Sequence, residues 1–242
     1  MKNIIKKIER ESNRLTAKIS DNFFKTTKFD MYQRRHSKSY QNDFKLKENQ
    51  FCFVHIPRTG GSSLHGLLLE NREDFYKGVH TAVSLLCNPK KYKYITVLRD
   101  PIERVFSFYL IQRKYKKLAF NPHAKQGLEF FLKKVWSCNN GICKFLNGRL
   151  ENELNDSLFK ISLENLENFY FIVDFENFDN NVKILSSKLN IKNDIEQSAL
   201  HQNNYETAEE KLTKEYKELI KKFNLYDIEI YKIYKEKYRN KY

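Results

Sequence analysis

Short apolar runs alternate along the chain with longer segments in which apolar side chains recur at helical spacing. Three runs have the length and composition of buried strands: 51–56, 94–98 and 169–173. Four segments show the helical pattern: 62–69, 102–115, 177–189 and 208–238. Strands that alternate with helices in this way predict an α/β fold, with a parallel β-sheet flanked by helices on both faces.

The first 49 residues have a different pattern. A few isoleucines and a leucine fall at roughly helical spacing among charged residues, and a run rich in Lys, Arg, Asn and Gln then continues to Gln50. We predict a basic N-terminal arm or helix over 1–49 and one compact domain over 50–242. For the arm, a helix on the domain or a partly disordered tail is favoured over a contact with an acidic partner or a membrane.

Charge narrows the possible partners. The chain has 44 Lys and Arg against 30 Asp and Glu, a formal net charge of +14, so nucleotide phosphates, acidic glycans, nucleic acids and membrane surfaces are candidates. The N-terminus shows no apolar core of a signal peptide, and no stretch reaches the roughly 18–20 apolar residues that cross a bilayer. We therefore expect a cytoplasmic protein, with a peripheral membrane contact left open.

The cysteines do not indicate a metal site. Cys52, Cys87, Cys138 and Cys143 include no CxxC pair and have no accompanying His cluster at the spacing of a zinc site. Cys138 and Cys143 are close enough in sequence for a disulfide in an oxidising compartment. Two reduced thiols are the favoured interpretation for an intracellular chain.

A glycine-rich segment follows the first predicted strand and leads into a helix. In FVHIPRTGGSSLHGLL, this segment places free backbone N–H groups and the positive end of a helix around one point. Two glycines let the backbone approach a phosphate closely, and three hydroxyls and one guanidinium add donors. An anion-binding loop is therefore predicted. Its residues are Arg58, Thr59, Gly60, Gly61, Ser62 and Ser63.

This loop differs from that of the nucleoside triphosphate enzymes. Their loop reads GxxxxGK(S/T), whereas here no Lys precedes Ser62 and no Gly stands at the start. ATP or GTP chemistry is therefore disfavoured. The alternative to a ligand site is an ordinary Gly-Gly turn capped by serine.

A second anion site is predicted at the end of the next strand. In VLRDPIERVFSFY, Arg99 falls at the carboxyl edge of the sheet, where α/β folds bind ligands, and Ser107 follows about two turns into the next helix. Asp100, followed by proline, suits the N-cap of that helix. The alternative is a plain helix start in which Arg99 pairs with a carboxylate. Arg104 and Glu103 are expected to form only surface pairs.

Together these two segments resemble the carbohydrate sulfotransferases that use 3′-phosphoadenosine 5′-phosphosulfate (PAPS), in particular the heparan sulfate O-sulfotransferases and bacterial relatives. HIPRTGGSSL is similar to that family's 5′-phosphosulfate loop, and YKYITVLRDPIERVFSFY is similar to its 3′-phosphate strand and helix, including the spacing from Arg99 to Ser107. Weaker similarities follow in GVHTAVSLL, NNGICKFLNG and NLYDIEIY, so the resemblance spans roughly residues 51–231.

The resemblance implies a P-loop-like α/β fold of the sulfotransferase type, PAPS as co-substrate, chemistry without a metal, and a basic cleft for a carbohydrate or glycan acceptor. The segment from Thr59 to Ser63 would bind the 5′-phosphosulfate, and Arg99 with Ser107 would bind the 3′-phosphate. Arg58 stands where the family usually has Lys. It would stabilise the negative charge that develops on the bridging oxygen of the leaving phosphate.

The resemblance also names a general base. His80, in GVHTAVSLL, matches the histidine that serves as base in the glucosamine 6-O-sulfotransferase branch, and the pKa of an ordinary imidazole suits that role. The alternative is a structural or surface histidine, with His201 as the reserve base. His55 resembles a family position that supports the loop and is expected to be structural.

Two other functions remain as alternatives. A nucleotide kinase with a variant phosphate loop would need a loop Lys and a magnesium-binding partner, which the sequence does not show. A non-enzymatic module that binds RNA or a polyanionic glycan would use the positive charge and the 15 Tyr and 19 Phe. Most of these aromatics lie in apolar runs and are expected in the core, so no nucleic-acid partner is expected. Trp136 is likewise expected in the core, with the acceptor cleft as its alternative place.

Overall fold

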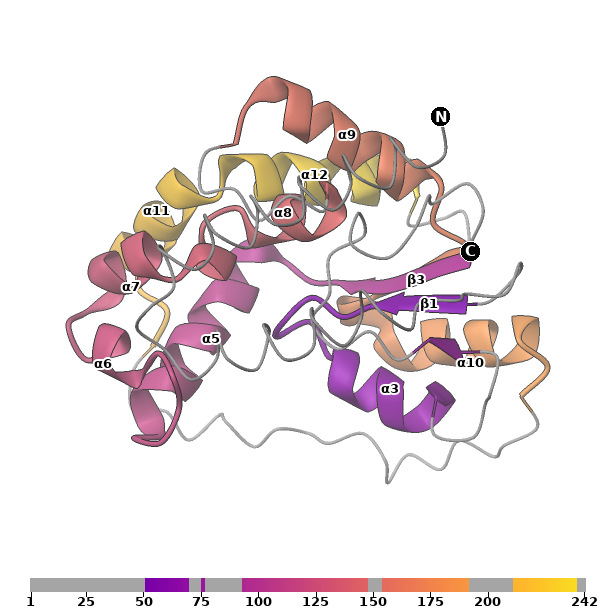
Figure 1. The fold of residues 1–242 in the computed structure, drawn as a ribbon, viewed down its shortest axis with the longest axis horizontal. Helices are drawn as coiled ribbons and strands as arrows, with labels where there is room; N and C mark the ends of the chain where they lie inside the picture. The colour runs from indigo at the N-terminus through magenta and orange to yellow at the C-terminus, as the bar shows by residue number, and fades with distance from the viewer. Residues whose placement is uncertain (1–50, 70–74, 77–92, 148–153, 192–210, 239–242) are drawn as a thin grey trace, which may run out of the picture. The chain divides into compact units, whose positions relative to one another are not determined.

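A computed structural model describes residues 51–69, 75–76, 93–147, 154–191 and 211–238 (Figure 1). The chain divides into two compact units, Met1–Lys45 and Leu46–Tyr242, and every described residue belongs to the second. The predicted N-terminal arm over 1–49 lies outside the described residues, as do His80, His201 and Cys87.

Four parallel strands form one sheet in the order β2-β1-β3-β4. Their bounds are Phe51–Val54 for β1, Phe75–Tyr76 for β2, Lys93–Leu98 for β3 and Phe171–Asp174 for β4. The prediction of an α/β fold with a parallel sheet flanked by helices is confirmed. The last strand begins two residues later than predicted, because Phe169 still belongs to the turn that closes the preceding helix and donates its N–H to the carbonyl of Leu166 (3.2 Å).

Helices lie on both sides of the sheet (Figure 1). One face is covered by α3 (Gly61–Leu69) and α10 (Phe178–Lys188). On the other side lie α8 (Gly141–Asn147), α9 (Asp156–Glu167) and α12 (Leu225–Lys237). The predicted helices at 62–69 and 177–189 therefore exist, with ends that differ by one residue.

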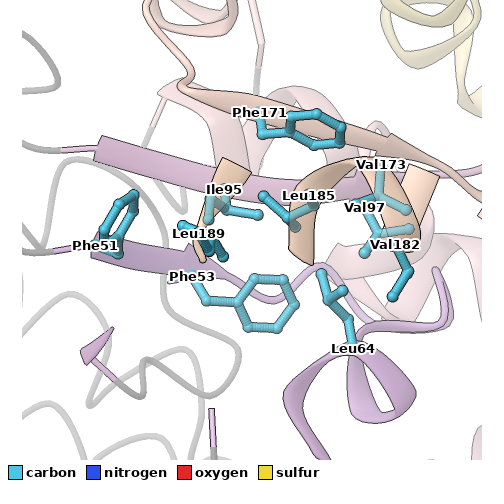
Figure 2. Packing of buried hydrophobic residues seen from close by; sticks show 10 residues of the cluster. All are labelled: Phe51, Phe53, Leu64, Ile95, Val97, Phe171, Val173, Val182, Leu185 and Leu189. Atoms are coloured by element: carbon cyan, nitrogen blue, oxygen red, sulfur yellow. The ribbon is translucent and has the colours of Figure 1, made fainter. Parts of the chain in front are cut away.

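Alternation along the strands builds the core under the first face. Because successive side chains of a strand point to opposite sides of the sheet, every second residue of β1, β3 and β4 turns toward α3 and α10. Figure 2 shows these side chains together with those that the two helices contribute. The cluster consists of Phe51, Phe53, Leu64, Ile95, Val97, Phe171, Val173, Val182, Leu185 and Leu189.

The remaining helices extend the fold beyond the carboxyl edge of the sheet. α5 (Pro101–Lys114) follows β3, as predicted, and Asp100 caps it by accepting hydrogen bonds from the N–H groups of Ile102 (2.8 Å) and Glu103 (3.0 Å). The bounds of the others are Asn121–Ala124 for α6, Leu128–Lys134 for α7, the 3₁₀ turn Trp136–Cys138 for η1, and Lys214–Phe223 for α11.

The helical tail predicted over 208–238 is two helices in the described residues, because α11 ends at Phe223 and α12 begins at Leu225. Between them, the buried side chain of Asn224 donates to the carbonyls of Cys138 and Ile220, both at 2.9 Å. Trp136 is buried and its ring packs on Phe145, with centroids 5.3 Å apart, which confirms the expected core position.

Three described cysteines are buried and reduced: Cys52, Cys138 and Cys143. Burial raises the pKa of the Cys138 and Cys143 thiols to about 12, so both stay protonated. The Sγ atom of Cys143 lies 3.1 Å from the Oγ atom of Ser162. These thiols are part of the packed interior and are not reactive groups.

Candidate anion-binding site

The two predicted anion motifs leave the sheet at the same edge. β1 and β3 are parallel neighbours, with Val54 opposite Thr96, and the Thr96 hydroxyl donates to the Val54 carbonyl at 2.8 Å. Parallel strands end on one side of a sheet. The segment that follows β1 and the segment that follows β3 therefore start from adjacent points, although some forty residues separate them in the sequence.

Backbone geometry shapes the loop after β1. Arg58 and Gly60 both have positive φ angles, of 69° and 87°, so the chain turns twice through a conformation that side chains disfavour. Thr59 is fully buried, and its hydroxyl donates to the carbonyl of Ile56 at 2.8 Å. α3 then begins at Gly61. Of the first N–H groups of α3, those of Ser63 and Leu64 donate to the Gly60 carbonyl (3.1 and 3.2 Å). The N–H groups of Gly61 and Ser62 are therefore the candidate donors at the positive end of this helix.

Aromatic rings pack closely against the two glycines of the loop. A Cβ atom on Gly61 would clash with the ring of His55, which is buried and stacked on Phe53 with centroids 5.6 Å apart. A Cβ atom on Gly60 would lie 3.0 Å from the ring of Phe175. The ring contact at Gly61 and the positive φ of Gly60 therefore favour glycine at both positions, and His55 lies where it supports the loop.

The loop also contacts the second motif directly. The guanidinium of Arg58 donates to the Ser107 hydroxyl through Nε (3.3 Å) and Nη2 (3.0 Å). The guanidinium of Arg99 donates through Nη1 to the backbone carbonyl of Arg58 (3.4 Å). Arg58, Arg99 and Ser107 therefore lie together, and not on different faces of the protein.

Two guanidinium groups share this place, and the carboxylates of Glu103 and Asp100 also act on Arg99. Burial lowers the pKa of Arg99, the nearby Glu103 raises it, and the like charge of Arg58 lowers it further. The Glu103 carboxylate is exposed and lies 4.0 Å from Arg99 Nη2. Since a loose pair with an exposed carboxylate compensates little charge, a bound anion would be stabilised here by both arginines.

The predicted hydroxyl donors of the loop are not equivalent. The Thr59 hydroxyl is used within the turn, and its side chain is shielded from solvent. Ser62 is exposed and Ser63 is half-buried at the start of α3, so both hydroxyls lie at the helix end where an anion would bind. The structure thus assigns Thr59 to the shape of the loop and leaves Ser62 and Ser63 as the accessible hydroxyls.

The expectation that Arg104 forms only a surface pair is wrong. Its side chain is completely buried, and Nη2 lies 3.4 Å from the Asp227 carboxylate and donates to the Ser137 carbonyl at 3.0 Å. Glu103, the adjacent residue, is exposed and approaches Arg99 instead. Because successive side chains of α5 point in different directions around the helix axis, Arg104 enters the core while the adjacent Glu103 faces solvent.

Sequence reasoning missed Phe175. It follows β4 at the same edge of the sheet, and the Arg99 guanidinium lies 4.3 Å from its ring centroid. The only sequence signal for it is its place two residues after the strand predicted over 169–173, because ligand sites of α/β sheets gather at the carboxyl ends of strands.

Within the described ranges, no group of three or more His, Cys, Asp or Glu side chains is arranged to hold a metal ion. None of the helices in this part of the chain combines the length and apolar character needed to span a bilayer. No model of a known protein family matches the sequence, and no curated protein proved similar to it.

Proposed function

We propose that the protein is a sulfotransferase that moves the sulfuryl group of PAPS to a hydroxyl of a carbohydrate acceptor. The observation that carries the proposal is the meeting of Arg58, Arg99 and Ser107 beside the start of α3. A nucleotide with phosphate groups at both its 3′ and 5′ positions matches a site that draws donors from two adjacent strand ends. A P-loop-like fold of the sulfotransferase type accords with the parallel sheet and the loop-to-helix transition after β1.

Each part of the site has a role in this proposal. The N–H groups of Gly61 and Ser62, with the hydroxyls of Ser62 and Ser63, bind the 5′-phosphosulfate. Arg99 and Ser107 bind the 3′-phosphate. Arg58 belongs to the loop by its backbone and reaches the second motif by its side chain, so its charge lies between the two ends of the nucleotide and stabilises the leaving phosphate.

In the reaction, the acceptor oxygen attacks sulfur while the bond from sulfur to the bridging phosphate oxygen breaks. The acceptor proton passes to a base, and adenosine 3′,5′-bisphosphate leaves with the electron pair. His80 is the proposed base on the strength of the sequence alone, since it lies outside the described residues.

The first test is nucleotide binding. Adenosine 3′,5′-bisphosphate should raise the melting temperature more than ATP or single-stranded RNA does at equal concentration. Arg99→Ala should weaken bisphosphate binding at least about tenfold, because a charged hydrogen bond to phosphate is lost. Arg113→Ala is the matched control, since Arg113 is an exposed arginine of the same helix, and its affinity should equal that of the wild type.

This comparison also separates the alternatives. Stronger stabilisation by ATP would favour a nucleotide kinase with a variant loop, and stronger stabilisation by RNA would favour a polyanion-binding module. An Arg99→Ala variant with unchanged bisphosphate affinity would remove the proposed 3′-phosphate site.

The second test is transfer itself. Labelled sulfate from PAPS should appear on at least one member of a panel of free and polymeric sugars. His80→Ala should reduce this transfer at least about a hundredfold, the usual contribution of a general base, while leaving bisphosphate affinity unchanged. If the variant keeps its turnover, another group takes the proton, and His201→Ala is the next variant to assay.

A further inference from the structure

Phe175 touches both halves of the candidate anion site although it belongs to neither motif. It is the first residue of η2 (Phe175–Asn177), the 3₁₀ turn that follows β4. The Arg99 guanidinium lies over its ring, 4.3 Å from the centroid, and the ring edge packs against Gly60 so closely that a Cβ there would be only 3.0 Å away. One aromatic side chain therefore spans the distance from the loop to the arginine.

These contacts restrict the arginine. An unrestrained arginine samples many rotamers, and holding it in one costs conformational entropy. A ring beneath the guanidinium offsets that cost through attraction between the cation and the π face, and its effect grows where water is excluded. Arg99 is only partly exposed, at 20% of its side-chain surface. Phe175 therefore favours the rotamer in which Arg99 donates to the Arg58 carbonyl.

The turn that carries Phe175 is itself held from two directions. The Glu176 N–H donates to the Asp174 carboxylate at 3.0 Å. From α12, the Tyr231 hydroxyl donates to Glu176 Oε1 (2.9 Å) and the Lys235 ammonium donates to Oε2 (2.7 Å). Burial, and then the hydrogen bond to Glu176, raise the pKa of Tyr231, so its phenol keeps the proton that it donates.

We propose that Phe175 is a positioning residue of the anion site: its ring fixes the Arg99 guanidinium relative to the Gly60 turn, and it acts on the bound anion through Arg99. The inference rests on the proposed function only for the identity of the anion. Its consequence is that anion affinity depends on an aromatic face at position 175 that the anion itself does not need to touch.

The experiment measures affinity for two probes, adenosine 3′,5′-bisphosphate and inorganic sulfate, by isothermal titration. Phe175→Leu keeps an apolar side chain against Gly60 but removes the π face, and it should weaken the bisphosphate about tenfold, or about 1.4 kcal/mol. Phe175→Tyr restores the face and should bind as the wild type does. Phe159→Leu is the matched control, because Phe159 is a half-buried ring packed on Tyr226 of α12 and should leave affinity unchanged.

A double-mutant cycle tests the route of action. If Phe175 works through Arg99, Phe175→Leu should cause no further loss in an Arg99→Ala background, whereas independent roles would give losses that multiply. Three results would overturn the inference. The losses of affinity could multiply in the double variant, Phe175→Tyr could bind the bisphosphate as weakly as Phe175→Leu, or Phe175→Leu could change affinity no more than Phe159→Leu does. If Phe175→Leu does not fold, Phe175→Met takes its place with the same expectations.

The two probes distinguish this failure from failure of the proposed function. Sulfate binding that depends on Phe175 in a protein that does not bind the bisphosphate would support the positioning role and overturn the nucleotide assignment. Bisphosphate binding that does not depend on Phe175 would support the nucleotide assignment and overturn the positioning role. A wild-type protein that binds neither probe would overturn both.

Discussion

Arg104, Lys144 and Asp227 place two positive charges and one negative charge in the interior, with side chains that are at most 1% exposed. The Asp227 carboxylate accepts the N–H groups of Ile142 (2.9 Å) and Cys143 (2.8 Å) as well as the Arg104 contact. Lys144 donates only to the Trp136 carbonyl, at 3.3 Å, among the bonds that the described residues show. Burial lowers the pKa of Lys144 to about 8.

This lysine makes stability depend on pH. Below pH 8 the folded protein carries a buried charge at a cost. Between pH 8 and the ordinary lysine value of 10.5, the folded state loses the proton while the unfolded state keeps it, so the cost disappears as the pH rises. Lys144→Met should therefore be about 2 kcal/mol more stable than the wild type at pH 7, with the lost hydrogen bond deducted.

The measurement is urea unfolding of the wild type and the variants at several pH values between 7 and 10. The advantage of Lys144→Met should shrink steadily as the pH is raised from 7 toward 10. Leu146→Met, a buried change on the same helix without an ionisable group, should differ from the wild type by an amount that does not vary with pH. A Lys144→Met advantage that stays constant would show that the ammonium is not the cause.

At the scale of elements, two turns cap each other across the fold. The Asn140 side chain accepts the N–H groups of Tyr226 (2.9 Å) and Asp227 (3.3 Å) at the start of α12. In return, the Asn224 side chain accepts the N–H of Asn140 (2.9 Å), and Asp227 accepts two N–H groups at the start of α8. Each helix start is thus satisfied by the other segment. These are the segments NNGICKFLNG and NLYDIEIY, whose contact no sequence spacing indicates.

α5 connects this pair of turns to the anion site. Its first turn follows Arg99, its middle carries Ser107, and Arg104 between them reaches Asp227 of α12. Gly141 lets the buried guanidinium pack closely at the junction, because a Cβ atom there would lie 3.0 Å from Arg104 Nη2. The same helix α12 also contacts the turn of Phe175 through Tyr231 and Lys235. It therefore contacts both the helix that follows Arg99 and the turn that carries Phe175.

Asp227→Ala should therefore destabilise the whole unit by about 3–5 kcal/mol, since it leaves the Arg104 charge buried without a partner and uncaps α8. Urea unfolding followed by circular dichroism measures the change. Asp156→Ala is the control: this exposed carboxylate accepts the Tyr226 hydroxyl at 3.1 Å, and its loss should cost less than about 1 kcal/mol. Equal effects of the two variants would contradict the importance of the buried pair.

At the scale of the whole described unit, strand order creates the candidate site. β1 and β3 lie side by side in the middle of the sheet, with β2 and β4 outside them (Figure 1). The crossovers between parallel strands bring every strand end of this sheet to one edge. The loop from Arg58 to Ser63, the Arg99 turn and the Phe175 turn therefore converge, although each belongs to a different strand.

The sequence by itself determined the local structure. Apolar runs and helical spacing located β1, β3, α3, α5 and α10 to within one or two residues, because these elements have one clear buried side or a clear cap such as Asp100. The hydrophobic pattern predicted no element between 116 and 168. One of the helices there, α8, is buried along its whole length and shows no polar face. The sequence also indicated the two polar motifs around Arg58 and Arg99.

Only the tertiary structure decided which distant residues meet. Arg104 was expected at the surface because its partner Asp227 lies 123 residues away. Phe175 was missed because its role depends on contacts with Gly60 and Arg99. The local pattern of hydrophobic residues indicates secondary structure and which side of an element is buried. Contacts between residues far apart in sequence depend on strand order and helix packing, which hydrophobic periodicity does not encode.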